Sequence, residues 1–152
     1  MSQENVEIVR RFIDATQRFF EAYWDNPRSI AEAVEADDLW PEYREALTYV
    51  HSEVEWKTVF LGETHRGYLA AARVWDDYFK WAEDYRVRLR EVTDLGDDRV
   101  YAALALVGKA KAGGAPMNAQ FFDVFTLSDG LIVRLEEYTD RAQALEAAGL
   151  RE

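Results

Sequence analysis

Hydrophobic residues recur every three or four positions in the first part of the chain, which is the period of an amphipathic helix. Residues 3–24 carry this pattern and predict one long helix. Asn26 and Pro27 are expected to end it and to start a second helix, with asparagine as the cap and proline at the first helical position. A third short helix is expected from Pro41 to about Val50.

The period shortens to two residues further along the chain, where strands are expected. Residues 53–60 alternate and predict a strand, followed by a loop over residues 62–67 and a helix over about residues 68–82. Four consecutive antiparallel strands are then expected. They begin near Tyr85 and continue over residues 100–107, 119–127 and 131–138, with a type I′ hairpin turn at Asp129-Gly130 between the last two.

This order of elements predicts the class of fold. Each helix and most strands have one apolar face to bury, so the N-terminal helices must cover one face of a curved, mostly antiparallel sheet. We therefore expect an α+β fold, a cone-shaped α+β barrel, over a single domain that spans residues 1–152. A cone leaves a cavity at its wide end, which is a favoured place for a small molecule.

The amino-acid composition argues against several classes of function. With 18 basic and 29 acidic residues the net charge is −11, which does not suit nucleic acid or an anionic membrane as a partner. The chain has no cysteine and two histidines, so we expect no metal site, and without a glycine-rich phosphate loop we expect no cofactor. It also lacks a signal-peptide pattern and a membrane-length apolar run, which favours a cytoplasmic protein.

Asp123 is the leading candidate for a catalytic residue. On a strand it shares one face with Phe121 and Phe125, so we expect it to point into the core. Burial disfavours the charged form and raises the pKa of a carboxyl group, which suits a general acid or base near neutral pH. The alternative is a structural aspartate that is satisfied by a tyrosine hydroxyl or a backbone amide.

His65 is the second catalytic candidate. At the rim of a pocket its side chain could shuttle a proton or donate a hydrogen bond to a carbonyl oxygen. The alternative is a loop histidine that meets solvent.

Aromatic residues could line a flat apolar pocket that suits a ring system, or could simply form the core. Glu136 shares strand parity with Tyr138, so it could point inward and pair with Arg134 unless a bulge changes the parity. An exposed ladder is the alternative for Glu136. The predicted pocket residues are Tyr23, Trp40, Trp56, Tyr68, Trp75, Phe79, Phe121, Phe125 and Tyr138.

Six segments of the chain carry a resemblance to known proteins, namely residues 2–11, 54–56, 64–68, 124–134, 137–141 and 144–150. These segments resemble SnoaL-like proteins of the nuclear transport factor 2-like superfamily. The resemblance covers nearly the whole chain and implies the cone-shaped fold, a dimer formed through the sheet, and an acid/base aspartate on a late strand, where Asp123 stands. The chain departs from the pattern over residues 25–50, where an additional helical insertion could lie over the mouth of the cone.

The resemblance and the residues together imply a small-molecule pocket protein, with an isomerase, cyclase or dehydratase acting on a compact hydrophobic substrate as one interpretation. His65 could pair with Asp123 as in a dehydratase, or Tyr23 could pair with Asp123 as in a ketosteroid isomerase, although no clear second base is present. An epoxide-hydrolase-like site is excluded because residues 100–107 carry no charge. A ligand-binding module without catalysis and a dimeric interaction domain with a collapsed pocket remain open.

Overall fold

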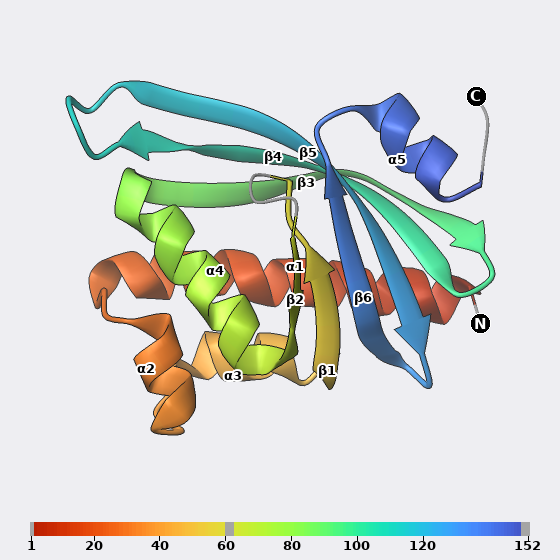
Figure 1. Cartoon of the computed structure of the whole chain (residues 1–152), viewed down its shortest axis with the longest axis horizontal. Coiled ribbons are helices and arrows are strands. Elements are labelled where there is room, and N and C mark those ends of the chain that lie inside the picture. Colours follow the sequence, from red (N-terminus) through yellow and green to blue (C-terminus); the bar gives the residue numbers. More distant parts are fainter. Residues whose placement is uncertain (1, 60–62, 150–152) are drawn as a thin grey trace.

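The computed structural model describes residues 2–59 and 63–149 of the chain, in which one sheet of six strands is packed against helices (Figure 1). The elements in chain order are α1 (Ser2–Asp25), α2 (Ile30–Glu35), α3 (Pro41–Leu47), β1 (Val50–Lys57), β2 (Thr64–Arg66), α4 (Gly67–Trp81), β3 (Ala82–Gly96), β4 (Arg99–Ala110), β5 (Pro116–Ser128), β6 (Leu131–Tyr138) and α5 (Arg141–Ala147).

The sheet is curved and does not close on itself. Its strands lie in the order β2-β1-β6-β5-β4-β3, and each neighbouring pair is antiparallel except β1 and β6, which are parallel. Helices α1, α3 and α4 lie on the concave side, whereas α5 lies on the opposite face (Figure 1). This arrangement confirms the predicted α+β fold, in which N-terminal helices cover a mostly antiparallel sheet.

Residues 100–106 of β4 are buried on both faces, which explains why this part of the strand carries no charge. Val100 and Leu104 belong to the main core between the sheet and the N-terminal helices. Tyr101 points the other way, into a smaller core that it forms with Val124 of β5 and Ala144 of α5. Because successive residues of a strand alternate between its faces, a strand covered on both sides has no position left for a charged residue.

The predicted start of the second helix is wrong. Helix α2 begins at Ile30, and its N-cap is Ser29 rather than Asn26. The reason is a tertiary contact with Asp76 of α4, whose carboxylate accepts hydrogen bonds from the Ile30 amide at 2.7 Å, the Ala31 amide at 3.0 Å and the Ser29 hydroxyl at 3.0 Å. A carboxylate at this position satisfies amides that have no partner within the helix.

The predicted loop over residues 62–67 was also wrong in part. Its described residues Thr64–Arg66 form the short edge strand β2, which pairs with β1. In contrast, the hairpin between β5 and β6 is confirmed, because Asp129 and Gly130 both have positive φ, 51° and 79°, as a type I′ turn requires.

The homodimer expected through the sheet stays a prediction. None of the helices in the described part of the chain is long and apolar enough to cross a membrane.

We expect Asp76→Ala to lower the free energy of unfolding by about 2 kcal/mol, because it leaves amides at the start of α2 without an acceptor. Asp77→Ala is the matched control, since Asp77 forms a surface ion pair with Lys80 and should change stability by less than about 0.5 kcal/mol. Urea denaturation of the two variants measures the difference. Equal losses in both variants would contradict the role of Asp76.

Candidate active site

A cavity of about 100 Å³ lies between the concave face of the sheet and the helices α1, α3 and α4. Its wall is mostly apolar. The predicted pocket residues that line it are Trp56, Tyr68, Trp75, Phe121 and Phe125. The sheet and three helices therefore all contribute to one compact space, whose size and lining suit a small apolar molecule.

Two acidic side chains interrupt this wall. Asp123 on β5 and Glu137 on β6 both line the cavity, and their side chains are buried, with residue exposures of 2% and 8%. The two residues stand directly opposite each other in the antiparallel ladder. Side chains at such positions have Cβ atoms about 5 Å apart, so the carboxyl groups are immediate neighbours.

A bulge in β6 brings Glu137 into the cavity. Thr126 is paired with Arg134 but the next residue, Leu127, is paired with Ile132, so Val133 is an extra residue in the ladder. The extra residue reverses the inward and outward positions after it. Glu137 therefore points inward. Sequence reasoning missed it because in a regular strand Glu137 would lie on the face opposite to Ile132, which is buried.

The same bulge places Glu136 and Tyr138 on the outer face. Arg134 forms an ion pair with Glu136 at 3.3 Å, and the Tyr138 hydroxyl donates a hydrogen bond to Glu136 at 2.9 Å. Glu136 is therefore part of an outer ladder, which was the alternative considered for it. The prediction that Tyr138 lines the pocket is wrong.

The pKa of Asp123 lies well above the ordinary value for a carboxyl group. Burial is the main cause, and the nearby negative charge of Glu137 adds to it. Asp123 Oδ1 is buried, and no hydrogen-bond partner for it is found among the described residues. A carboxyl group without a donor or a cation beside it favours its neutral, protonated form.

Burial also raises the pKa of Glu137, to about 7, but here hydrogen-bond donors oppose the shift. The Tyr78 hydroxyl donates to Glu137 Oε1 over a long 3.4 Å, and the backbone amide of Val59 interacts with the same carboxylate. The indole N–H of Trp56 faces it as well, although outside good hydrogen-bond geometry. These donors favour the ionised form, so in the coupled pair Glu137 carries the charge before Asp123 does.

Tyr23, Trp40 and Phe79 do not line the cavity. They pack together in the core, with ring centroids 4.4 Å apart for Tyr23 and Phe79 and 5.8 Å apart for Tyr23 and Trp40. The structure therefore does not bring Tyr23 to Asp123 as an oxyanion pair. The tyrosine that contacts the carboxyl pair is Tyr78 of α4.

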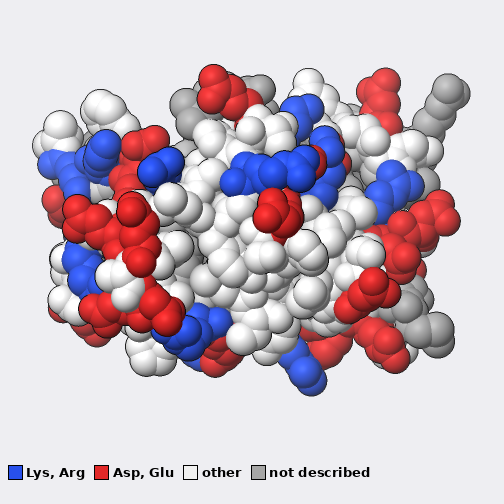
Figure 2. All heavy atoms as spheres, turned by 60° about the horizontal axis from the view of Figure 1, so that its bottom comes forward, with Lys and Arg blue, Asp and Glu red and all other residues white. Residues whose placement is uncertain are grey.

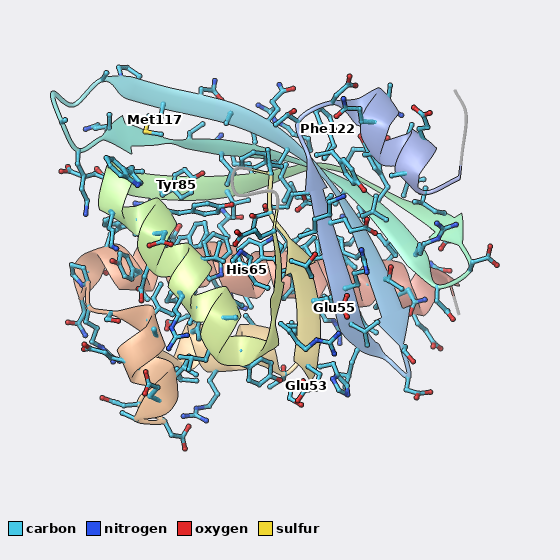
Figure 3. The ribbon with its side chains drawn as sticks, in the orientation of Figure 1. Glu53, Glu55, His65, Tyr85, Met117 and Phe122 are labelled. Carbon is cyan, nitrogen blue, oxygen red and sulfur yellow. The ribbon has the colours of Figure 1, made fainter. Side chains whose placement is uncertain are left out.

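His65 lies on the edge strand β2 rather than at the cavity (Figure 3). It is paired with Trp56 of β1, and both β1 and β6 separate it from β5. Strands are about 4.8 Å apart, so three such steps place His65 about 14 Å from β5, too far for a hydrogen bond to Asp123. The described residues also contain no group of three or more His, Asp or Glu side chains arranged to hold a metal ion.

The segment over residues 25–50, which was predicted to be an insertion, contributes to the described cavity wall through one of its two helices. Helix α3 supplies Tyr43, Ala46 and Leu47 to the cavity wall. Helix α2 packs against α4 instead and supplies no lining residue. Whether the insertion moves as a lid stays a prediction.

Sequence comparison shows the family to which the chain belongs. A sequence model of the SnoaL-like domain matches residues 27–135, which is more than half of the chain. The chain belongs to the SnoaL-like domain family. The match includes Asp123 and the insertion from residue 27 onward, and it ends two residues before Glu137. No curated protein matches the chain significantly in sequence.

Solved structures resemble this SnoaL-like chain over nearly its whole length. An NTF2-like protein of unknown function from Burkholderia pseudomallei is 17% identical, covers 94% of this chain and 95% of its own, and has a TM-score of 0.63. A putative polyketide cyclase from Xanthomonas campestris is 19% identical, with coverages of 91% and 92% and a TM-score of 0.62. A protein with a ketosteroid isomerase-like fold from Catenulispora acidiphila, in complex with trimethylamine, is 15% identical, with coverages of 95% and 93% and a TM-score of 0.61. At these identities the likeness shows the fold.

We expect the carboxyl pair to make the protein less stable as pH rises. Because the folded pKa values lie above the ordinary ones, the folded chain binds more protons than the unfolded chain, and stability falls from about pH 4.5 through the raised pKa of Glu137 near 7. Each unit of raised pKa corresponds to about 1.4 kcal/mol.

Glu137→Gln should therefore flatten the stability curve and be more stable than wild type at pH 8 by at least about 1 kcal/mol. Asp123→Asn should act in the same direction. Glu136→Gln, which removes an identical group from the outer face, should keep the wild-type slope. Denaturant melts between pH 4.5 and pH 8 measure this, and an unchanged slope in both cavity variants would show that neither carboxyl group is desolvated as described.

Proposed function

We propose that this SnoaL-like protein catalyses proton transfer on a compact hydrophobic substrate, as an isomerase, cyclase or dehydratase that needs no cofactor. One observation carries the proposal. Asp123 and Glu137 are neighbouring buried carboxyl groups in the wall of an apolar cavity, and their surroundings differ. Two such groups whose environments separate their pKa values are suited to act as acid and base.

The surroundings assign a role to each carboxyl group. Glu137, with donors around its carboxylate, is the base that removes a proton from a substrate carbon. Asp123, protonated and with Oδ1 unpartnered among the described residues, is the acid that gives its proton to the substrate oxygen. The product of this step is an enol, with the removed proton on Glu137 and a new negative charge on Asp123. Glu137 then gives this proton to a different carbon while Asp123 takes back the proton of the enol hydroxyl, which completes an isomerisation and restores both carboxyl groups.

The cavity limits the substrate. Its volume of about 100 Å³ suits a molecule of about one ring, and the aromatic and aliphatic wall favours a substrate with few polar groups. A carbonyl oxygen beside Asp123 would be such a group. The putative polyketide cyclase from Xanthomonas campestris, a structural neighbour, supports the cyclase branch of the proposal by analogy.

Binding without turnover is the second candidate. The observation that favours it is that Asp123 alone could anchor a ligand, since a carboxyl group with an unpartnered oxygen needs no reaction to gain a hydrogen bond. In that function Glu137 would only tune the charge of Asp123.

Deuterium incorporation from D₂O into cyclohexanone and cyclohex-3-enone tests the catalytic proposal, because it detects removal of a carbon-bound proton whatever the natural substrate is. We expect the wild-type protein to accelerate exchange, and Asp123→Asn and Glu137→Gln each to reduce the rate about 100-fold or more. Glu136→Gln is the control and should match wild type. An absence of acceleration while these ketones occupy the cavity would favour binding without turnover.

A further inference from the structure

We propose that the cavity binds compact tertiary amines as protonated cations, with the ammonium N–H directed at Asp123 Oδ1 and the alkyl groups against the aromatic wall. This binding function uses the same cavity as the proposed proton transfer but does not depend on it. It requires only the shape and the charge of the site, whereas the proposed reaction requires an acid and a base that act in sequence.

The acidic side chains of the cavity have no cationic residue beside them among the described lining residues. Asp123 and Glu137 are acidic, and no Lys, Arg or His is found among the described residues that line the cavity. A buried carboxylate is strongly disfavoured unless a cation or hydrogen-bond donors accompany it. An ammonium ligand would supply the positive charge that none of the described lining residues provides.

The hydrogen-bond acceptor that the cavity offers indicates how many N–H groups a bound amine should carry. Asp123 Oδ1 is buried and has no partner among the described residues, so it can accept one strong hydrogen bond. A tertiary ammonium has one N–H and three apolar substituents. A primary ammonium has three N–H groups, and in a mostly apolar wall it would lose water without replacing all of its hydrogen bonds.

The wall suits a cation as well as an apolar group. Trp56 and Trp75 pack with ring centroids 5.0 Å apart, and Phe12 meets Phe125 edge-to-face at 6.0 Å, and all four line the cavity. The negative faces of aromatic rings attract the positively polarised C–H groups around an ammonium nitrogen, most strongly when water is excluded.

The overall field also favours cations. The net charge of −11 raises the local concentration of cations around the protein. Figure 2 shows Asp and Glu gathered towards both ends of the face that it presents, with uncharged surface and a cluster of Lys and Arg between them.

Binding of the cation should follow the ionisation of the pair. Tyr78 of α4 and Tyr85 of β3 interact electrostatically with Glu137, and Tyr43 and Tyr68 also line the cavity. Burial raises the pKa of all four hydroxyls, so they stay neutral at physiological pH. Among the described residues that line the cavity, the charge therefore changes only through Asp123 and Glu137. As pH rises through their range the cavity becomes negative and holds a cation better, whereas a neutral ketone loses the proton that Asp123 donates to it.

Calorimetric titration with N-methylpiperidine and with cyclohexanone, two rings of similar size, tests this inference. The amine is a cation at both pH 5.5 and pH 8, and we expect its affinity to rise at least tenfold between them. The affinity of cyclohexanone should stay constant or fall. N,N-dimethylpiperidinium, which has no N–H, should bind less tightly than N-methylpiperidine.

Asp123→Asn and Glu137→Gln should each weaken amine binding at pH 8 at least tenfold, while the outer-face control Glu136→Gln should bind like wild type. Amine affinity that is independent of pH, or equal in all three variants, would overturn the inference, and equal affinity for the quaternary compound would overturn the N–H assignment. If the amine fails to bind but ketone exchange persists, the amine inference is wrong and the catalytic proposal stands. If the amine binds and no exchange occurs, the amine inference stands and the catalytic proposal is wrong.

Discussion

Two carboxyl groups that face each other inside an apolar wall oppose folding, because burial and mutual repulsion both disfavour their charge. Asp123 and Glu137 are held in this position by the ladder between β5 and β6. Tyr78 of α4 and the amide of Val59 interact with Glu137, whereas Asp123 Oδ1 has no hydrogen-bond partner among the described residues. The resulting asymmetry gives the two groups different protonation states and makes the site chemically useful.

The helices cover the carboxyl pair and complete the wall of the cavity. Helix α4 supplies Tyr78 to the carboxyl pair and Trp75 to the cavity wall, and it also holds the start of α2 through Asp76. Helix α3, from the segment over residues 25–50 that was predicted to be an insertion, forms another part of the wall with Tyr43. The insertion is therefore joined to the site by packing on one side and by a helix cap on the other.

The proposed acid/base catalysis and the proposed amine binding draw on the same property of the cavity, which is a charge that depends on protonation and has no cation beside it among the described lining residues. A neutral substrate would use the protonated form of Asp123 as a donor, whereas an ammonium would use the ionised pair as a counter-charge. The fold alone does not choose between these uses, because related folds carry unrelated functions. The protonation state of the carboxyl pair distinguishes the two uses, because a neutral substrate requires protonated Asp123 whereas an ammonium requires the ionised pair.

The sequence by itself determined the helices, most strands and the inward position of Asp123, because the periods of 3.6 and 2 residues are local properties. The tertiary structure decided the rest of the site. A single bulged residue, Val133, turned Glu137 inward and Tyr138 outward, and the strand order separated His65 from Asp123. Asp76, distant in sequence, fixed where α2 begins. Register, strand order and contacts between helices depend on residues far apart in the chain, so no local pattern could have supplied them.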